Sequence, residues 1–169
     1  YVGDAYVALF RGTPIIVQIF VFHFVIFPML GSALSGVMEC CIVFGLNSGA
    51  YVSEIMRGGI LSVDIGQTEA GRTLGLSYTT TMFRIVIPQA IKNVIPTLGN
   101  EFITLTKDTS VAGYASITDL TFAFRTLTDG GTNVMAPYIV LAVCYLILIA
   151  FFTVIIRLVE RRLRKSERR

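Results

Sequence analysis

The stretch from Met135 to Ile156 contains no charged side chain, and it constrains the fold more than any other feature of the sequence. A helix of about 20 apolar residues crosses the hydrocarbon core of a bilayer. Hydrophobic residues make up 54% of the chain and charged residues 15%, against about 25% charged in a typical globular domain. A soluble chain of 169 residues could not bury this much apolar surface. We therefore predict an all-α fold, a polytopic bundle of membrane helices.

Two earlier segments, 14–30 and 34–55, are also apolar and are predicted spans. We expect Thr13 to cap the first of these helices, with Pro14 at its first position. In the second segment Gly45 and Gly49 form a G-x-x-x-G pattern, which favours close helix packing. The alternative is that this face lines a transport pathway, together with Asn47 and Ser48.

The segment 94–111 is apolar on balance but carries ionisable side chains. It is either a fourth span whose polar face looks into a bundle or a watery cavity, or a re-entrant or interfacial helix. Ionisable groups within a membrane are costly, which favours a functional role in the substrate pathway over a structural pair of Lys107 with Asp108. The candidates for that role are Glu101, Thr104, Lys107 and Asp108.

Basic residues set the predicted orientation. Half of the fourteen Lys and Arg residues lie after Ile156, in the tail 157–169, and four more lie in the loop 57–92. Cytoplasmic segments are enriched in Lys and Arg, so we expect this loop, the tail and both observed ends to be cytoplasmic. At the edge of the second span, Glu54 and Arg57 are predicted to form an interfacial ion pair that contributes little.

The loop 57–92 is too long for a simple turn and has helical character. We expect a short helix that starts near Thr68 as its cap, with Glu69 in the first turn, then a break at Gly75. A second short helix is expected to stop at Pro88. This helix–glycine–helix arrangement forms a compact knob suited to docking into a groove on a partner. Glu69 is then either a simple helix-start carboxylate or a contact with that partner, and Gly75 either a helix stop or the bend that shapes the knob.

The loop resembles the EAA loop of bacterial ABC-importer permeases. That pattern reads E-A-A, three residues, G, nine residues, I-x-L-P. The spacing here is identical, with Gly71 in place of the second Ala and Ile87 in place of Leu. The resemblance assigns coupling to a separate ATPase to Glu69, Ala70, Gly71, Gly75, Ile85 and Pro88.

Three other segments, 10–20, 46–60 and 107–110, resemble the polar amino acid permease group of that family. The resemblance, over about residues 6–165, implies a type I importer permease in the bacterial cytoplasmic (inner) membrane that moves polar amino acids by alternating access. It also implies three protein partners: an ATP-binding cassette ATPase that holds ATP and Mg²⁺, a second permease subunit, identical or different, and an extracytoplasmic amino-acid-binding protein. Such subunits usually have five spans, so we expect one N-terminal span to be missing from this chain.

Other functions find less support in the sequence. A net charge of +3 argues against nucleic-acid binding, and no phosphate-binding loop, metal-ligand spacing or nucleophile–base pair suggests an enzyme or a bound cofactor. His23 is expected to be packed or hydrogen-bonded, and the three cysteines to be packing residues. The remaining alternatives are an ion-coupled secondary transporter, with Glu101 and Asp108 as ion sites, and a membrane scaffold.

Overall fold

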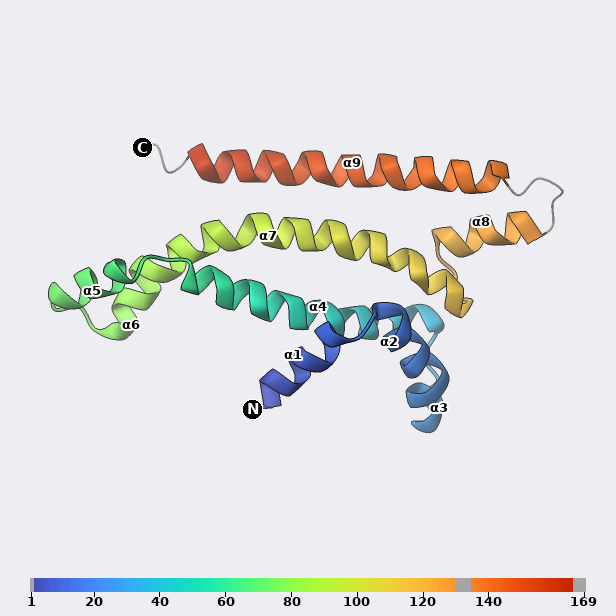
Figure 1. Cartoon of the computed structure of the whole chain (residues 1–169), viewed down its shortest axis with the longest axis horizontal. Coiled ribbons are helices and arrows are strands. Elements are labelled where there is room, and N and C mark those ends of the chain that lie inside the picture. The colour runs from blue at the N-terminus through green and yellow to red at the C-terminus, as the bar shows by residue number, and fades with distance from the viewer. Residues whose placement is uncertain (1, 130–134, 166–169) are drawn as a thin grey trace. The chain divides into compact units, whose positions relative to one another are not determined.

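The computed structural model describes residues 2–129 and 135–165, and every regular element within these ranges is helical (Figure 1). The all-α prediction is confirmed. The α-helices are α1 (Val2–Gly12), α2 (Ile15–Val21), α3 (Phe27–Met29), α4 (Gly36–Leu61), α5 (Ile65–Thr73), α6 (Tyr78–Thr81), α7 (Ile87–Asp108), α8 (Leu120–Asp129) and α9 (Met135–Lys165). Two π-helical segments, Phe22–Ile26 and Met82–Val86, and one 3₁₀ segment, Thr109–Ala115, connect some of them.

The chain divides into two compact units. Unit 1 comprises residues 1–51 and 102–154, and unit 2 comprises residues 52–101 and 155–169. The helices α4, α7 and α9 each begin in one unit and end in the other. That residues 1–169 form a single transmembrane domain, with the span boundaries given above, stays a prediction.

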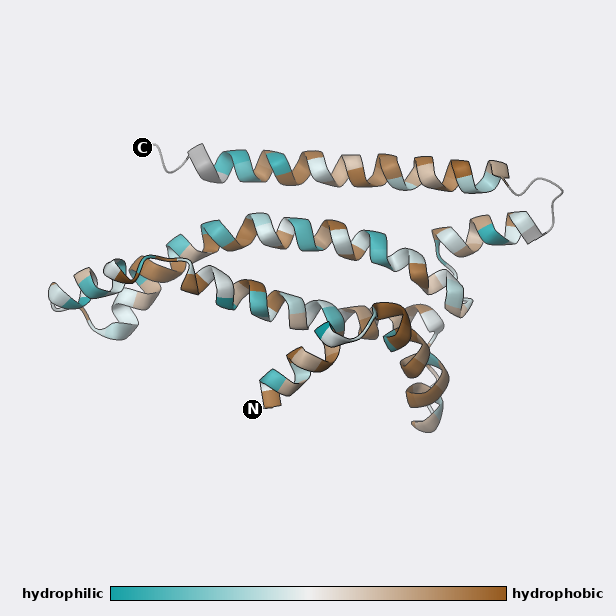
Figure 2. Ribbon diagram, viewed as in Figure 1, coloured by the Kyte–Doolittle hydropathy of each residue, from teal (hydrophilic) through white to brown (hydrophobic). Residues whose placement is uncertain are grey.

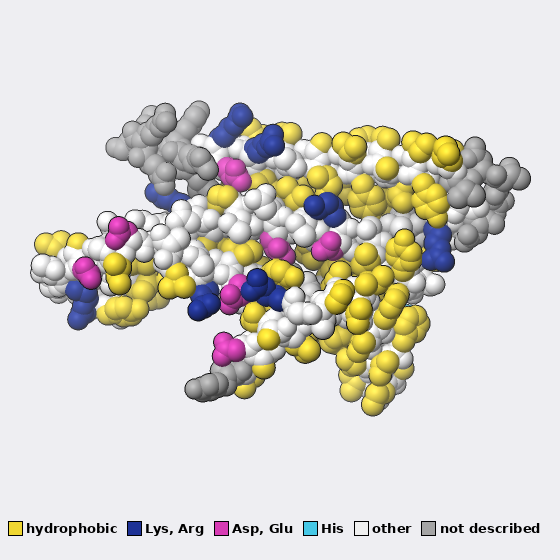
Figure 3. Space-filling model, in the orientation of Figure 1, with side chains coloured by type: hydrophobic (Ala, Val, Ile, Leu, Met, Phe, Trp, Pro, Cys, Tyr) yellow, Lys and Arg dark blue, Asp and Glu magenta, His cyan; other side chains and the backbone are white. Residues whose placement is uncertain are grey.

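Among the described residues, α9 is the one helix long and apolar enough to cross a membrane by itself. Its stretch Met135–Arg162 contains an 18-residue window with a mean hydropathy of 3.1, and only 6% of that window is buried. Figure 2 shows this apolar stretch giving way to polar residues toward the C-terminal end of α9. On the face shown in Figure 3, hydrophobic side chains lie along α9 and basic side chains gather toward that same end. These features match a membrane helix with a basic anchor.

The other predicted spans are helical, but their helices are more polar or bent. The run Ile15–Met29 meets the length and hydropathy criterion only together with α1, as a pair bent by 105°. Helix α4 extends beyond the predicted segment to Leu61, and α7 begins at Ile87, well before Val94. Helix α4 does not meet the hydropathy criterion, and it carries the buried polar residues Glu39 and Asn47.

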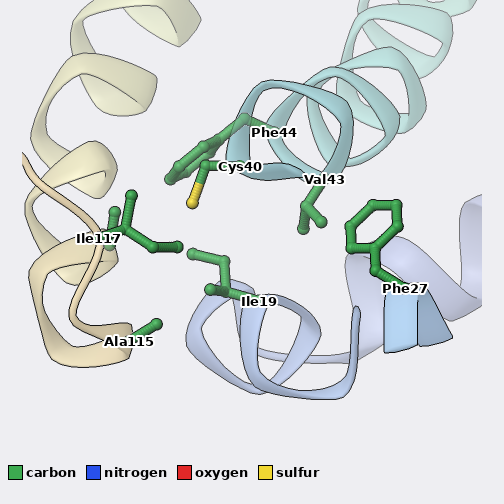
Figure 4. Close-up of a cluster of buried hydrophobic side chains, with 8 residues drawn as sticks. Ile19, Phe27, Cys40, Val43, Phe44, Ala115 and Ile117 are labelled. Atoms are coloured by element: carbon green, nitrogen blue, oxygen red, sulfur yellow. The ribbon is translucent and has the colours of Figure 1, made fainter. Parts of the chain in front are cut away.

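A hydrophobic cluster forms the core of unit 1 (Figure 4). It joins α2, α3, α4, the 3₁₀ segment and the loop residue two positions after that segment. Its members are Ile19, Phe27, Cys40, Val43, Phe44, Ala112, Ala115 and Ile117. Ile19 and Val43, each 1% exposed, lie at its centre. The packing role predicted for cysteine holds for Cys40, and none of the three cysteines is in a disulfide.

His23 pairs with a carboxylate in the same unit. Its Nδ1 lies 2.5 Å from Oε2 of Glu39, at the start of α4, and its ring meets the ring of Phe24 edge-on at a centroid separation of 4.7 Å. The predicted hydrogen-bonded environment of His23 is confirmed. The π-helical segment Phe22–Ile26 carries this side chain, and Glu39 is itself buried.

At the bend between α1 and α2, Thr13 does not cap α2 as the sequence predicts. Pro14 is the N-cap residue of α2 and makes no side-chain cap. The Thr13 hydroxyl instead donates to the carbonyl of Leu9 (2.8 Å), in the preceding helix. Because α1 is helical up to Gly12, its last carbonyls need donors, and the Thr13 hydroxyl satisfies one of them.

Two buried amides close the rest of the bend. Nε2 of Gln18 lies within hydrogen-bond distance of the Phe10 carbonyl (2.8 Å) and of the carbonyl and hydroxyl of Thr13 (3.0 and 2.8 Å). Nδ2 of Asn47 donates to the Phe10 carbonyl and to Oε1 of Gln18, both at 3.1 Å. Unsatisfied backbone groups are costly in an apolar environment, so this network holds α1, α2 and α4 together.

Replacing Asn47 by Ala should therefore destabilise the protein. The substitution leaves buried acceptors on Phe10 and Gln18 with fewer donors, and each such loss costs roughly 1–3 kcal/mol. Thermal unfolding of the purified protein in detergent measures the effect. Asn100→Ala, which removes an exposed amide from α7, is the matched control. Equal melting temperatures for the two variants would contradict the role of the network.

Candidate functional site

The first helix of the loop begins earlier than the sequence predicts. Its N-cap is Asp64, whose carboxylate accepts a hydrogen bond from the backbone N–H of Gly66 at 2.7 Å. Aspartate is a stronger cap than threonine, which explains why Asp64 and not Thr68 starts α5. Glu69 consequently lies in the second turn of α5, where interaction with the helix dipole has fallen off. The interpretation of Glu69 as a simple helix-start carboxylate is thus wrong.

The predicted glycine break is confirmed at Gly75. This residue has a φ of +82°, which an L side chain rarely adopts. Its N–H donates to the carbonyl of Arg72 (3.0 Å), and the N–H of Leu76 donates to the carbonyl of Gly71 (3.1 Å). These two bonds form a Schellman motif, which satisfies the last carbonyls of α5 and ends it sharply. The hydroxyl of Ser77 then caps α6 by accepting from the N–H of Thr80 at 3.1 Å.

The predicted stop at Pro88 is wrong, since the second helix continues through this residue. From Tyr78 to Asp108 the chain is helical throughout, in the order α6, the π-helical segment Met82–Val86, and α7. Proline lacks the N–H that an α-helix uses, and its ring crowds the preceding turn. The π-helical turn, which ends two residues before Pro88, changes the hydrogen-bond register and lets the helix pass this residue.

Helix α5 packs back against this continuous helix at Gly71. Gly71 is buried, and a Cβ atom at this position would lie 2.7 Å from Cγ2 of Thr81 and 3.3 Å from Cδ1 of Ile85. The side chains of Gln67 and Gln89 are hydrogen-bonded at 3.2 Å between the same two helices. The two helices thus form a helical hairpin that turns at Gly75.

The residues assigned to coupling divide into an exposed set and a packed set. Glu69, Ala70, Gly75 and Pro88 are exposed, whereas Gly71 is buried and Ile85 is half-buried. Large apolar side chains are also exposed on the hairpin, including Ile65 (74%), Leu74 (80%) and Phe83 (66%). An exposed apolar surface beside a carboxylate is typical of a protein-docking surface.

A polar hollow of about 640 Å³ lies next to α5 in unit 2. Its lining residues are Ser62, Val63, Asp64, Gln67, Gln89, Lys92 and Asn93. The amide of Asn93 donates to the Ser62 hydroxyl at 2.9 Å across the base of the loop. On α4, Glu54 and Arg57 form the predicted ion pair at 3.6 Å. Because their side chains are 34% and 69% exposed, the pair contributes little to stability.

The structure places the pathway candidates on two helices. Asn47 and Ser48 lie on α4, where Asn47 is buried in the amide network and Ser48 is half-buried. The other candidates lie along the last two turns of α7. Of these, Glu101 and Asp108 are half-buried, whereas Thr104 and Lys107 are exposed. Their role in a pathway stays a prediction.

Sequence reasoning missed three groups. Gln18 and Glu39 sit in apolar segments, and a lone amide or carboxylate there was a usable signal for an internal partner. Thr81 carried no signal, because nothing in the sequence shows that its side chain packs on Gly71.

Comparison with known proteins agrees with this architecture. Residues 1–165 match the family described as "Binding-protein-dependent transport system inner membrane component". The L-cystine transport system permease protein TcyB of Bacillus subtilis (strain 168) is 40% identical over 167 residues, covering 96% of this chain and 70% of that protein. The arginine transport system permease protein ArtQ of the same organism is 34% identical over 167 residues, covering 99% and 76%.

Solved structures show the same fold. "Crystal structure of an amino acid ABC transporter with histidines" matches with a TM-score of 0.88 and 35% identity, over 94% of this chain and 74% of that chain. An inward-facing MetNI methionine ABC transporter matches with a TM-score of 0.78 over 95% and 73%, and at 17% identity this likeness shows the fold alone. These matches confirm the resemblance found in the sequence and give no support to the ion-coupled alternative. The chain belongs to the family of inner membrane components of binding-protein-dependent transport systems and is a permease subunit of an ABC importer.

Proposed function

We propose that this permease subunit moves polar amino acids inward by alternating access, and that a separate ATPase, which binds α5, drives the transport. The observation that carries the proposal is the helical hairpin of unit 2, with the exposed Glu69 and Ala70 at its surface and a sharp stop at Gly75. The relatives named for cystine and arginine transport support an amino acid as substrate. The membrane-spanning helices would form the pathway together with a second permease subunit.

The hairpin offers a short route for transmitting motion. A displacement of α5 passes to the helix it packs on, which runs without a break from Tyr78 into α7. Helix α7 ends with Glu101, Thr104, Lys107 and Asp108, our candidates for the substrate pathway. A rigid helical connection loses less of a displacement than a flexible loop does. Differential contacts in the inward-open and outward-open states would then carry the coupling.

The partners follow from the same proposal. ATP and Mg²⁺ bind to the ATPase, since the sequence has no phosphate-binding loop of its own. An extracytoplasmic binding protein delivers the amino acid. The subunit lies in the cytoplasmic membrane with the hairpin and the basic end of α9 on the cytoplasmic side, an orientation that the distribution of Lys and Arg supports.

Reconstitution tests the proposal directly. The permease is purified with its ATPase, placed in liposomes with the binding protein, and assayed against a panel of amino acids. We expect at least one polar amino acid to stimulate ATP hydrolysis and to enter the vesicles. Uptake driven by an ion gradient without ATP, or uptake of none of the panel, would contradict it.

Charge reversal at Glu69 should uncouple the transporter. The side chain is exposed in the middle of α5, so Glu69→Arg should change the stability of the subunit by no more than about 0.5 kcal/mol. At a docking surface the same change should lower uptake about tenfold or more, because one reversed charge contact costs over ~1.4 kcal/mol. Uptake and membrane abundance are measured together, with Glu69→Gln as the neutral variant of similar shape. Full uptake by Glu69→Arg would rule out a coupling contact at this position.

Substitutions at Gly75 should rank by their tolerance of a left-handed backbone. Alanine at a φ of +82° costs about 1–2 kcal/mol, whereas asparagine accepts this region more readily. We expect amino-acid-stimulated ATPase activity to fall in the order wild type, Gly75→Asn, Gly75→Ala. Nothing lies within 4 Å of a Cβ at this position, so steric clash does not confound the series. Equal activity in all three proteins would show that the shape of this turn is unimportant.

A further inference from the structure

The contact between α5 and α6 brings a glycine of one helix against a threonine side chain of the other. Gly71 stands where the EAA pattern has its second alanine, and a Cβ there would lie 2.7 Å from Cγ2 and 2.9 Å from Oγ1 of Thr81. Neither distance is compatible with an alanine unless something moves. The side chain of Thr81 thus fills the space that a Cβ atom at position 71 would need.

Thr81 is placed for its shape and not for its hydroxyl. The residue is 0% exposed, and its Oγ1 is buried without a hydrogen-bond partner among the described groups. A buried hydroxyl without a partner costs free energy, so the contact between the threonine side chain and Gly71 must offset this loss. Thr81 is also the last residue of α6, directly before the π-helical segment that leads into α7.

Two further contacts align the hairpin. Cδ1 of Ile85 would lie 3.3 Å from a Cβ on Gly71, and Gln67 is bonded to Gln89 nearer the base of the hairpin. The pairs 71 with 81, 71 with 85 and 67 with 89 show that α5 runs antiparallel to the helix it packs on. The contact between Gly71 and Thr81 leaves no room for a Cβ atom between the two helices at this point.

We propose that Thr81 is a positioning residue for energy coupling: its side chain, fitted against Gly71, sets how far α5 stands from the helix that continues into α7. This inference rests on the proposed function, because it gives the docked helix its fixed place. Substitution of Gly71 by Ala, which restores the residue of the EAA pattern, should impair this particular subunit. Replacing Thr81 by Ala in the same protein should restore its coupling.

The test is a size-exchange series in the reconstituted complex of permease, ATPase and binding protein. The variants are Gly71→Ala, Thr81→Ala, Thr81→Val and the double variant Gly71→Ala/Thr81→Ala. Gly58→Ala is the control for added volume, since nothing lies within 4 Å of a Cβ there, and Thr79→Ala is the control for an exposed threonine on the same helix. The readouts are amino acid uptake per ATP hydrolysed, ATPase retained on purification and amount of assembled complex.

We expect Gly71→Ala to lower uptake per ATP at least about threefold, because overpacking shifts α5. The double variant should return to within about twofold of wild type, because the two atoms that clash are gone. Thr81→Val keeps the shape without the hydroxyl and should match wild type. Thr81→Ala leaves a void and should fall between wild type and Gly71→Ala.

Three results would overturn the assignment: Gly71→Ala behaving like Gly58→Ala, a double variant no better than Gly71→Ala, or losses that disappear when activity is expressed per assembled complex. Failure of the proposed function looks different. In that case the wild-type protein itself retains no ATPase or shows no amino-acid-stimulated hydrolysis, whatever the variants do.

Discussion

Satisfaction of backbone hydrogen bonds where helices break is the constraint on which the rest of this structure depends. A helix end leaves backbone N–H and C=O groups without intrahelical partners, and at the two main breaks the chain itself supplies the donors and acceptors. Here the bend between α1 and α2 is closed by the amides of Gln18 and Asn47, and the end of α5 by a Schellman motif at Gly75. The first break ties three helices of unit 1 together, and the second shapes the hairpin of unit 2.

The hairpin shows how a short loop can serve as a mechanical part. Its first helix is capped by Asp64, stopped at Gly75 and seated on Thr81, so both its ends and its middle are fixed. Its second helix passes Pro88 through a π-helical turn and continues as α7. Under the function proposed above, such a connection would transmit movement from the partner ATPase to the membrane helices.

Several parts of this description could be predicted from the sequence. The helical class, the apolar stretch of α9, the hydrogen-bonded state of His23 and the break at Gly75 follow from local rules, because each depends on a residue's own chemistry or on composition over one segment. The exact start of a helix was less predictable where two nearby residues could each serve as its cap. Asp64 and Thr68 are both good caps, and only the folded chain shows which one is used.

The sequence by itself determined that this chain is helical, membrane-bound and of the importer permease family, because composition and motif spacing persist whatever the packing. Only the tertiary structure decided how the residues assigned to coupling are packed. In the sequence Gly71 is only a weak helix former, whereas in the folded chain its missing Cβ makes room for the side chain of Thr81. Pro88 is a helix breaker in isolation, and the π-helical turn before it makes it part of a continuous helix. Contacts between residues distant in sequence depend on where whole helices lie, and that is a property of the fold.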